Sequence, residues 1–202
     1  MILSTAYFPP VQYVALLYQK GSAQIELWEH YVKQSYRNRM TILSANGKLD
    51  LIMPLEKAQG SKTLIKDVKI AYHDRWNAEH WNAINSAYNS SPFFEYYKED
   101  LERFFSKKYT FLIDYNQEIL QCILQLLHIQ CDIQFTQDFA KPNDTDDDFR
   151  YTISPKVASS AEFPPYTQVF EDKFAFIPNL SILDLLCNEG PESKEYLNKV
   201  VL

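Results

Sequence analysis

The chain has 202 residues and a formal net charge of −6, which argues against broad nucleic-acid binding because such binding needs a basic surface. This length fits one domain that buries about 70% of the surface of its unfolded chain. The three cysteines are widely spaced and form neither a CxxC motif nor a metal-ligand cluster, which favours free thiols in a reducing cytosol.

The first residues predict a short strand that runs directly into a helix. Residues 2–8 are mainly apolar, and Pro9 and Pro10 end this run, since proline can open a helix without losing a hydrogen bond. Apolar side chains then follow helical spacing at Val14, Leu17 and Tyr18. Free N–H groups at such a helix start can bind an anion, but strand-helix turns are common and the structural interpretation is favoured. The segment lacks the basic start of a signal peptide, so none is predicted.

Residues 23–28 predict the next strand, and the segment 33–40 that follows concentrates positive charge without any acid. If this segment is extended, its side chains alternate between two faces, so Arg37 and Arg39 share one face. Two guanidinium groups on one face repel each other unless an anion lies between them. That anion can be a phosphate, a carboxylate ligand or an acid from elsewhere in the fold.

An Asn-Gly pair at positions 46 and 47 is the strongest short-range signal in the sequence. It predicts a β-hairpin between strands at residues 37–44 and 49–55. Both arginines are therefore expected on one arm of an antiparallel hairpin. Residues 64–71 alternate in polarity and predict another strand.

Helical spacing predicts the elements that follow. Apolar stripes mark three helices, at Trp81, Ile84 and Tyr88, at Phe94, Tyr97, Leu101, Phe104 and Phe105, and at Ile119, Leu120, Ile123, Leu124 and Leu127. Residues 131–135 and 167–177 have the character of strands. The acidic run at 143–148 lacks the pattern of a calcium loop and predicts a solvated loop. Ser181 is the predicted N-cap of a last long helix, which ends before Gly190.

These elements predict one α/β domain over residues 1–202, a mixed sheet with a central antiparallel hairpin and helices packed on it. No run of about 18 apolar residues occurs, so we expect no membrane span and a cytoplasmic location. With 4 glycines, the chain also offers little basis for a glycine-rich phosphate loop.

Two histidines are the candidates for catalysis. The motifs of serine hydrolases, P-loop kinases, zinc proteases and dinucleotide-binding dehydrogenases are absent from the sequence. His30 and His80 each adjoin an aromatic residue and can act as general bases, although a structural histidine is the favoured alternative for each. No pair of histidines or cysteines has metal-ligand spacing, so we expect neither a metal nor another cofactor.

Several blocks of the sequence form a recognisable set: Tyr7-Phe8-Pro9-Pro10 with Tyr13, Tyr36-Arg37-Asn38-Arg39, Met53-Pro54-Leu55, Trp76 with His80-Trp81, Ala87-Tyr88 to Tyr97, and Leu180-Ser181-Ile182 to Asn188-Glu189-Gly190. In these blocks the chain resembles the WbqC-like family of bacterial proteins. Members are associated with gene clusters for O-antigen and other surface polysaccharides, so the resemblance implies modification of nucleotide-linked sugars, as a transferase. One departure is Thr5-Ala6, where the family often has Gln-Pro before the first tyrosine.

These observations together predict one pocket with a histidine beside an anion site. The predicted substrate-binding residues are Tyr7, Gln12, Tyr13, Gln34, Arg37, Asn38 and Arg39. Arg37 and Arg39 would hold a diphosphate or carboxylate of an anionic small molecule such as a nucleotide sugar, and His30 or His80 would move a proton. The alternative is a non-catalytic interaction protein of the same pathway. Arginines paired with local acids, beside an exposed Tyr/Phe patch, would favour that alternative.

Overall fold

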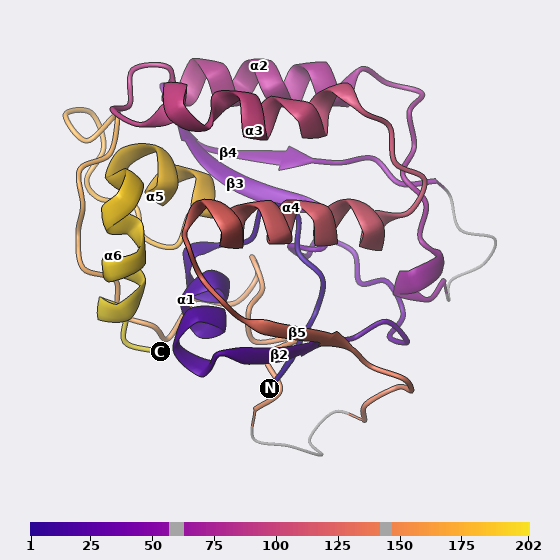
Figure 1. The fold of residues 1–202 in the computed structure, drawn as a ribbon. Helices are drawn as coiled ribbons and strands as arrows, with labels where there is room; N and C mark the ends of the chain where they lie inside the picture. The colour runs from indigo at the N-terminus through magenta and orange to yellow at the C-terminus, as the bar shows by residue number, and fades with distance from the viewer. Residues whose placement is uncertain (57–62, 142–146) are drawn as a thin grey trace.

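Two small sheets form the framework of the chain (Figure 1). This computed structural model describes residues 1–56, 63–141 and 147–202. A parallel sheet has the strand order β1 (Ile2–Leu3), β2 (Ser22–Ile25) and β5 (Asp132–Phe135). The predicted α/β class is confirmed, with strands of both orientations divided between this sheet and a separate hairpin.

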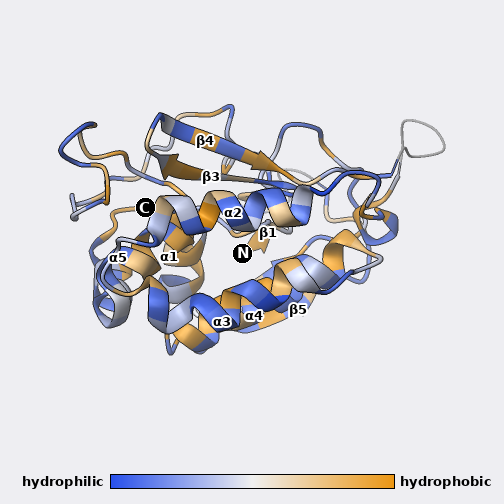
Figure 2. Cartoon of the chain, turned by 90° about the horizontal axis from the view of Figure 1, so that it is seen from above, coloured by the Kyte–Doolittle hydropathy of each residue, from blue (hydrophilic) through white to orange (hydrophobic). Residues whose placement is uncertain are grey.

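The hairpin consists of β3 (Arg39–Ser44) and β4 (Gly47–Ile52), which are paired antiparallel along their whole length. Residues 45 and 46 form the turn between them, so the hairpin predicted from the Asn-Gly pair is confirmed. β3 is mainly hydrophobic and buries Met40 and Ile42, whereas β4 is largely exposed and mixes polar with apolar residues (Figure 2). The hairpin therefore has one strand in the core and one at the surface.

Helices cover both sheets. They are α1 (Val11–Lys20), α2 (Trp76–Tyr88), α3 (Phe94–Ser106), α4 (Leu112–Leu126), α5 (Ile182–Glu189) and α6 (Ser193–Lys199), with 3-10 turns η1 (Ile65–Asp67) and η2 (Gly190–Glu192). Helix α2 packs on α3 and on β3, while α1 contacts β2, α5 and α6 (Figure 1). The predicted N-cap at Ser181 is confirmed, because its hydroxyl accepts a hydrogen bond from the Leu183 N–H at 3.4 Å.

Three predicted strands are shorter than expected or absent. Residues 64–71 pair with three different segments at isolated positions, so they form η1 and bridges instead of a strand. The strand predicted at residues 2–8 ends at Leu3, because the chain then turns away from β2 and Tyr7 bonds to the loop before β3. Residues 167–177 form an irregular loop, which the Gln168 side chain closes through two hydrogen bonds to the backbone of Ile177.

Two further expectations concern the acidic run and membrane spans. Residues 143–146 of the acidic run lie outside the described residues, while the Asp147 carbonyl accepts a hydrogen bond from the Ile2 N–H at 2.8 Å. Within the described ranges, no helix combines the length and the apolar character that a membrane span requires.

The core between the helices is strongly aromatic. Six aromatic side chains in it are at most 1% exposed: Tyr7, Phe8, Tyr88, Phe94, Phe104 and Tyr115. Phe8 also stacks on Phe105, with 5.8 Å between the ring centroids and 3° between the planes. Large rings fill the space between α2, α3 and α4, which fits the high aromatic content of the sequence.

Gly190 ends α5 in a conformation that allows no side chain. Its φ is +53°, and a Cβ built there would lie 2.4 Å from Cγ of Phe93. We expect Gly190→Ala to lower the free energy of unfolding by about 2–4 kcal/mol, because strain and overpacking add. Gly21→Ala is the control: its φ is +71°, but no atom lies within 4 Å of the added Cβ. This control should lower the free energy of unfolding, measured by urea denaturation, by about 1 kcal/mol. Equal losses at both positions would contradict the clash with Phe93.

Candidate functional site

The predicted site residues do not form one pocket. Arg37, Asn38 and Tyr13 are buried, and Tyr7 pairs with His80 of α2. Arg39 lines an open groove on the hairpin, and Gln12 supports the walls of that groove. His30 and Gln34 are exposed, and neither side chain makes a hydrogen bond to another described residue.

Arg37 is an interior residue of the turn before β3. Its side chain is 3% exposed, and its Nε and Nη2 donate to the carboxylate of Glu29, itself 1% exposed, at 2.7–2.9 Å. Nη2 also donates to the Ser4 hydroxyl at 2.6 Å. The expectation that Arg37 and Arg39 share one face of a strand is wrong, because β3 begins at Arg39 and Arg37 lies in the turn before it. The anion on Arg37 is an acid from elsewhere in the fold, one of the alternatives predicted from the sequence.

A second buried ion pair lies beside the first. Arg150 donates to Glu26 at 3.1 Å and to Asp148 at 2.6–2.9 Å, and the side chains of Arg150 and Glu26 are 0% exposed. The Ser4 hydroxyl joins the two pairs, since it donates to the Arg150 carbonyl at 3.3 Å. Glu26 and Glu29 were missed from sequence, although two acids within four residues of the end of β2 are the signal that could have indicated a polar centre.

Other predicted residues hold this centre in place. The Tyr13 hydroxyl donates to the Ser4 carbonyl at 2.9 Å. Asn38 accepts from Tyr31 and donates to the Met53 carbonyl, both at 2.8 Å. A cavity of about 10 Å³ lies between the side chains of Ser4, Tyr13, Arg37 and their neighbours, which is room for about one water molecule. In this conformation the buried centre has no space for a substrate.

Tyr7 and His80 form a hydrogen-bonded pair in the aromatic core. The Tyr7 hydroxyl lies 3.0 Å from Nδ1 of His80, and the imidazole ring also packs edge-on against Trp76. Burial lowers the pKa of His80 to about 4, a shift that a hydrogen bond with the Ile52 backbone partly opposes. The ring is therefore neutral at pH 7. This environment suits a structural histidine.

An open groove of about 660 Å³ lies against the exposed face of the hairpin; we call it the Arg39 groove. Arg39, Thr41, Lys48 and Asp50 of the hairpin line it, together with Tyr36 from the turn before β3. Its other wall comes from residues 155–163 and 178–180. Gln12 ties that wall together, because its Oε1 accepts from Ser159 at 2.9 Å and from Asn179 at 3.4 Å. Three cationic side chains and one acid line the groove, the third cation being Lys156.

Arg39 is only partly engaged in this groove. Its Nη1 donates to Oδ2 of Asp50 at 2.9 Å, and the Thr41 hydroxyl donates to Oδ1 of the same carboxylate at 2.7 Å. The Arg39 Nε–H is buried and has no hydrogen-bond partner among the described residues. Within the described part of the chain, Lys48 and Lys156 make no ion pair. The groove thus has a net charge of +2 on a protein of −6.

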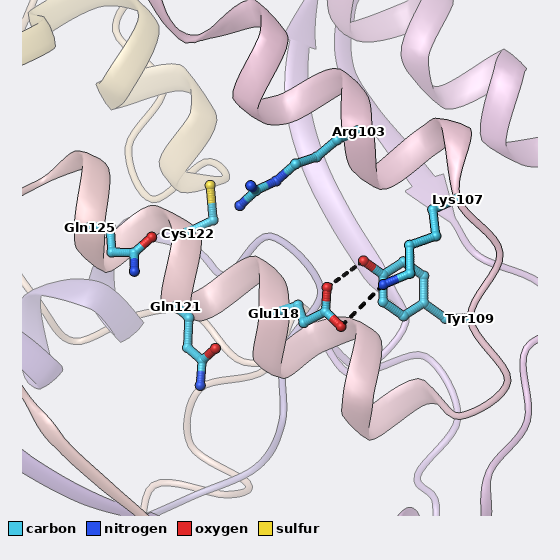
Figure 3. A pocket seen from close by; sticks show the side chains of 7 residues that line it. All are labelled: Arg103, Lys107, Tyr109, Glu118, Gln121, Cys122 and Gln125. Atoms are coloured by element: carbon cyan, nitrogen blue, oxygen red, sulfur yellow. Dashed lines mark hydrogen bonds and ion pairs between the residues drawn. The ribbon is translucent and has the colours of Figure 1, made fainter.

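A second pocket, of about 480 Å³, lies between α3 and α4 and is a weaker candidate for a ligand site (Figure 3). Glu118 accepts from the Tyr109 hydroxyl at 2.6 Å and pairs with Lys107 at 3.5 Å. This acid therefore neutralises part of the positive charge of the pocket. Arg103 extends towards the Cys122 thiol, but burial raises the pKa of this thiol more than the guanidinium lowers it. Cys122 is therefore a weak nucleophile.

The comparison with known families gives one result. The model of the WbqC-like protein family matches residues 5–161 and 151–196. Neither the curated proteins nor the solved structures include a significant match to this chain.

The two arginines should differ sharply in their effect on stability. Arg37→Ala leaves Glu29 buried without its partner, so the free energy of unfolding should fall by about 3–5 kcal/mol. Arg39→Ala removes a pair whose acid is 43% exposed, and the loss should be below about 1 kcal/mol. Urea denaturation of both variants measures the difference. A stable Arg37→Ala protein would show that the buried pair is not needed for the fold.

His80 should make the fold sensitive to acid. Its pKa is about 4 in the folded protein against 6.5 when unconstrained, so the stability it contributes is complete above pH 6.5 and is lost as the pH falls towards 4. Between pH 7 and pH 5 the wild-type protein should lose about 2 kcal/mol more than His80→Gln, which does not titrate. Urea denaturation at both pH values gives this difference, and parallel losses would assign the acid sensitivity to other groups.

Proposed function

The chain belongs to the WbqC-like protein family, and on that premise we propose that it binds a small phosphorylated or carboxylated molecule in the Arg39 groove. The observation that carries the proposal is the buried Nε–H of Arg39, which has no partner among the described residues in a groove with excess positive charge. A buried donor without an acceptor is unfavourable, and a ligand oxygen would remove that cost.

The size and lining of the groove support a small-molecule ligand. Its volume of about 660 Å³ lies within the usual range of ligand pockets, about 300–1,000 Å³. A guanidinium suits phosphate and carboxylate oxygens because it presents several donors in one plane. Thr41, Ser159 and Asn179 add neutral polar groups that can bond to the rest of a ligand, and the Tyr36 ring provides an apolar surface.

The family gives this ligand a biological setting. Its association with gene clusters for surface polysaccharides suggests that the ligand is a nucleotide-linked sugar and that the protein acts as a transferase in precursor synthesis. The diphosphate of such a molecule complements the net charge of +2 in the groove. We assign substrate binding to the groove, and the wall of Ser159 and Asn179 to contacts with sugar hydroxyls.

A second candidate function is that of a non-catalytic interaction protein in the same pathway. Two observations favour it: Arg37 and Arg39 both pair with acids of the chain, and several aromatic rings are exposed. Phe139 and Tyr151, 47% and 45% exposed, lie within 6 Å of the buried Arg150 guanidinium. Binding of a partner enzyme by the wild type would support this function if the double variant Phe139→Ala with Tyr151→Ala no longer binds that enzyme.

Arg39 should determine affinity for an anionic ligand. Arg39→Ala should weaken binding of uridine diphosphate by about 1.5–3 kcal/mol, because one charge-assisted pair is lost from a partly desolvated site. Arg39→Lys should recover part of this loss, since a lysine is a point charge without the planar fork. Isothermal titration calorimetry at constant ionic strength measures both effects.

Arg103→Ala is the control for this titration, because it removes the same charge from the other pocket. It should leave the affinity for uridine diphosphate unchanged. Failure of the wild-type protein to bind nucleotide sugars, pyrophosphate or organic acids would refute the proposed function.

A further inference from the structure

Asp50 occupies a position on Arg39 that the acidic group of a ligand would take. It lies on β4 opposite Thr41 of β3, and Arg39 is two residues before Thr41, so the three side chains lie on one face of the hairpin. Both oxygens of the Asp50 carboxylate are used, one by the Thr41 hydroxyl at 2.7 Å and the other by Arg39 at 2.9 Å. The protein therefore provides its own carboxylate at the proposed ligand site.

The contact between Asp50 and Arg39 is nevertheless incomplete. A carboxylate can accept two parallel hydrogen bonds from a guanidinium, but Asp50 accepts one, from Nη1. The Nε–H lies on the other edge of the guanidinium, beside Nη2, and stays buried and unpaired among the described residues. Because the Asp50 side chain is 43% exposed, water screens the pair and its displacement costs little. An incoming anion can thus replace Asp50 on Arg39.

The exchange favours some anions over others. A single carboxylate that displaced Asp50 from Nη1 would replace one carboxylate by another, and it would gain little, because the Nε–H lies on a different edge of the guanidinium. A phosphoryl group carries about −1.5 to −2 charges and three acceptor oxygens, so it can bond to Arg39 and also attract Lys48. Lys48 is two residues from Asp50 on the same face of β4 and makes no ion pair within the described ranges.

We infer that Asp50 competes with the ligand for Arg39, and that the Arg39 groove therefore selects phosphoryl groups with two or more charges over single carboxylates. This inference rests on the proposed function and specifies its ligand. Asp50 is a specificity-determining residue: it weakens the binding of every anion, so that only those with contacts beyond Arg39 bind measurably.

Calorimetric titration with inorganic pyrophosphate and with acetate tests this inference. The wild-type protein should bind pyrophosphate and show no measurable heat with acetate. Asp50→Asn should bind pyrophosphate about two- to fivefold more tightly, the equilibrium equivalent of removing one exposed ion pair.

Two controls separate competition for Arg39 from general repulsion of anions. Asp67→Asn changes the net charge by the same amount on η1, which lies outside the groove, and should leave affinity unchanged. In an Arg39→Met background, Asp50→Asn should give no gain, because the contested group is gone. A gain that persists in this background would overturn the inference, as would acetate binding to the wild type as tightly as pyrophosphate does.

The outcomes also separate this inference from the proposed function. If neither the wild type nor Asp50→Asn binds pyrophosphate or nucleotide sugars, the groove is not an anion site and both fail. If the wild type binds and Asp50→Asn gains no more than Asp67→Asn, the proposed function stands and competition by Asp50 is refuted. Binding by Asp50→Asn alone would refute the proposed function of the wild-type protein and show only that Asp50 excludes anions from Arg39.

Discussion

The buried ion pairs of Arg37 and Arg150 constrain the arrangement of the rest of the chain. Removing a charge from water costs several kcal/mol per ion, and close hydrogen-bonded partners must offset this cost. Glu26 meets the condition with four partners, the N–H groups of Trp28 and Ala140, the Thr136 hydroxyl and the Arg150 guanidinium. These partners come from the loops that follow β2 and β5, so satisfying one carboxylate fixes several loops at once.

This constraint also explains where a ligand can bind. In open parallel sheets, ligands usually occupy the crevice at the carboxyl ends of the strands. Here Ser4, Glu26 and Thr136 directly follow the three parallel strands. Ser4 accepts from Arg37, Glu26 accepts from Arg150, and Thr136 donates to Glu26, so these hydrogen bonds fill that place. The proposed ligand site lies instead on the hairpin, where the single acid in the lining is exposed and the Arg39 guanidinium keeps an N–H that has no partner in the part of the chain that the structure describes. Structural charges and ligand-directed charges are thus divided between two layers of the molecule.

The features that could be predicted from sequence are those set by neighbouring residues. The Asn-Gly turn and the Ser181 cap act within four residues, and both are where the sequence places them. Arg37 was misplaced because strand alternation was extended back through a turn, in which Gln34 has a φ of +56°. Its partner Glu29 comes from another loop, and no local pattern specifies that contact. The Arg39 groove was equally hidden, since its second wall comes from residues more than 100 positions along the chain.

The separation of Glu26 and Arg150 along the chain has a consequence for biosynthesis. These two residues are 124 positions apart, and β2 pairs with β5 across a similar interval. A ribosome therefore releases Glu26 long before the arginine that neutralises it, and during this interval the carboxylate must remain hydrated. The nascent chain can form α1 and the hairpin early, because their contacts are local, but its parallel sheet must wait until β5 has been synthesised. Translation thus delays completion of the polar centre until the hairpin and helices α2, α3 and α4 have been synthesised.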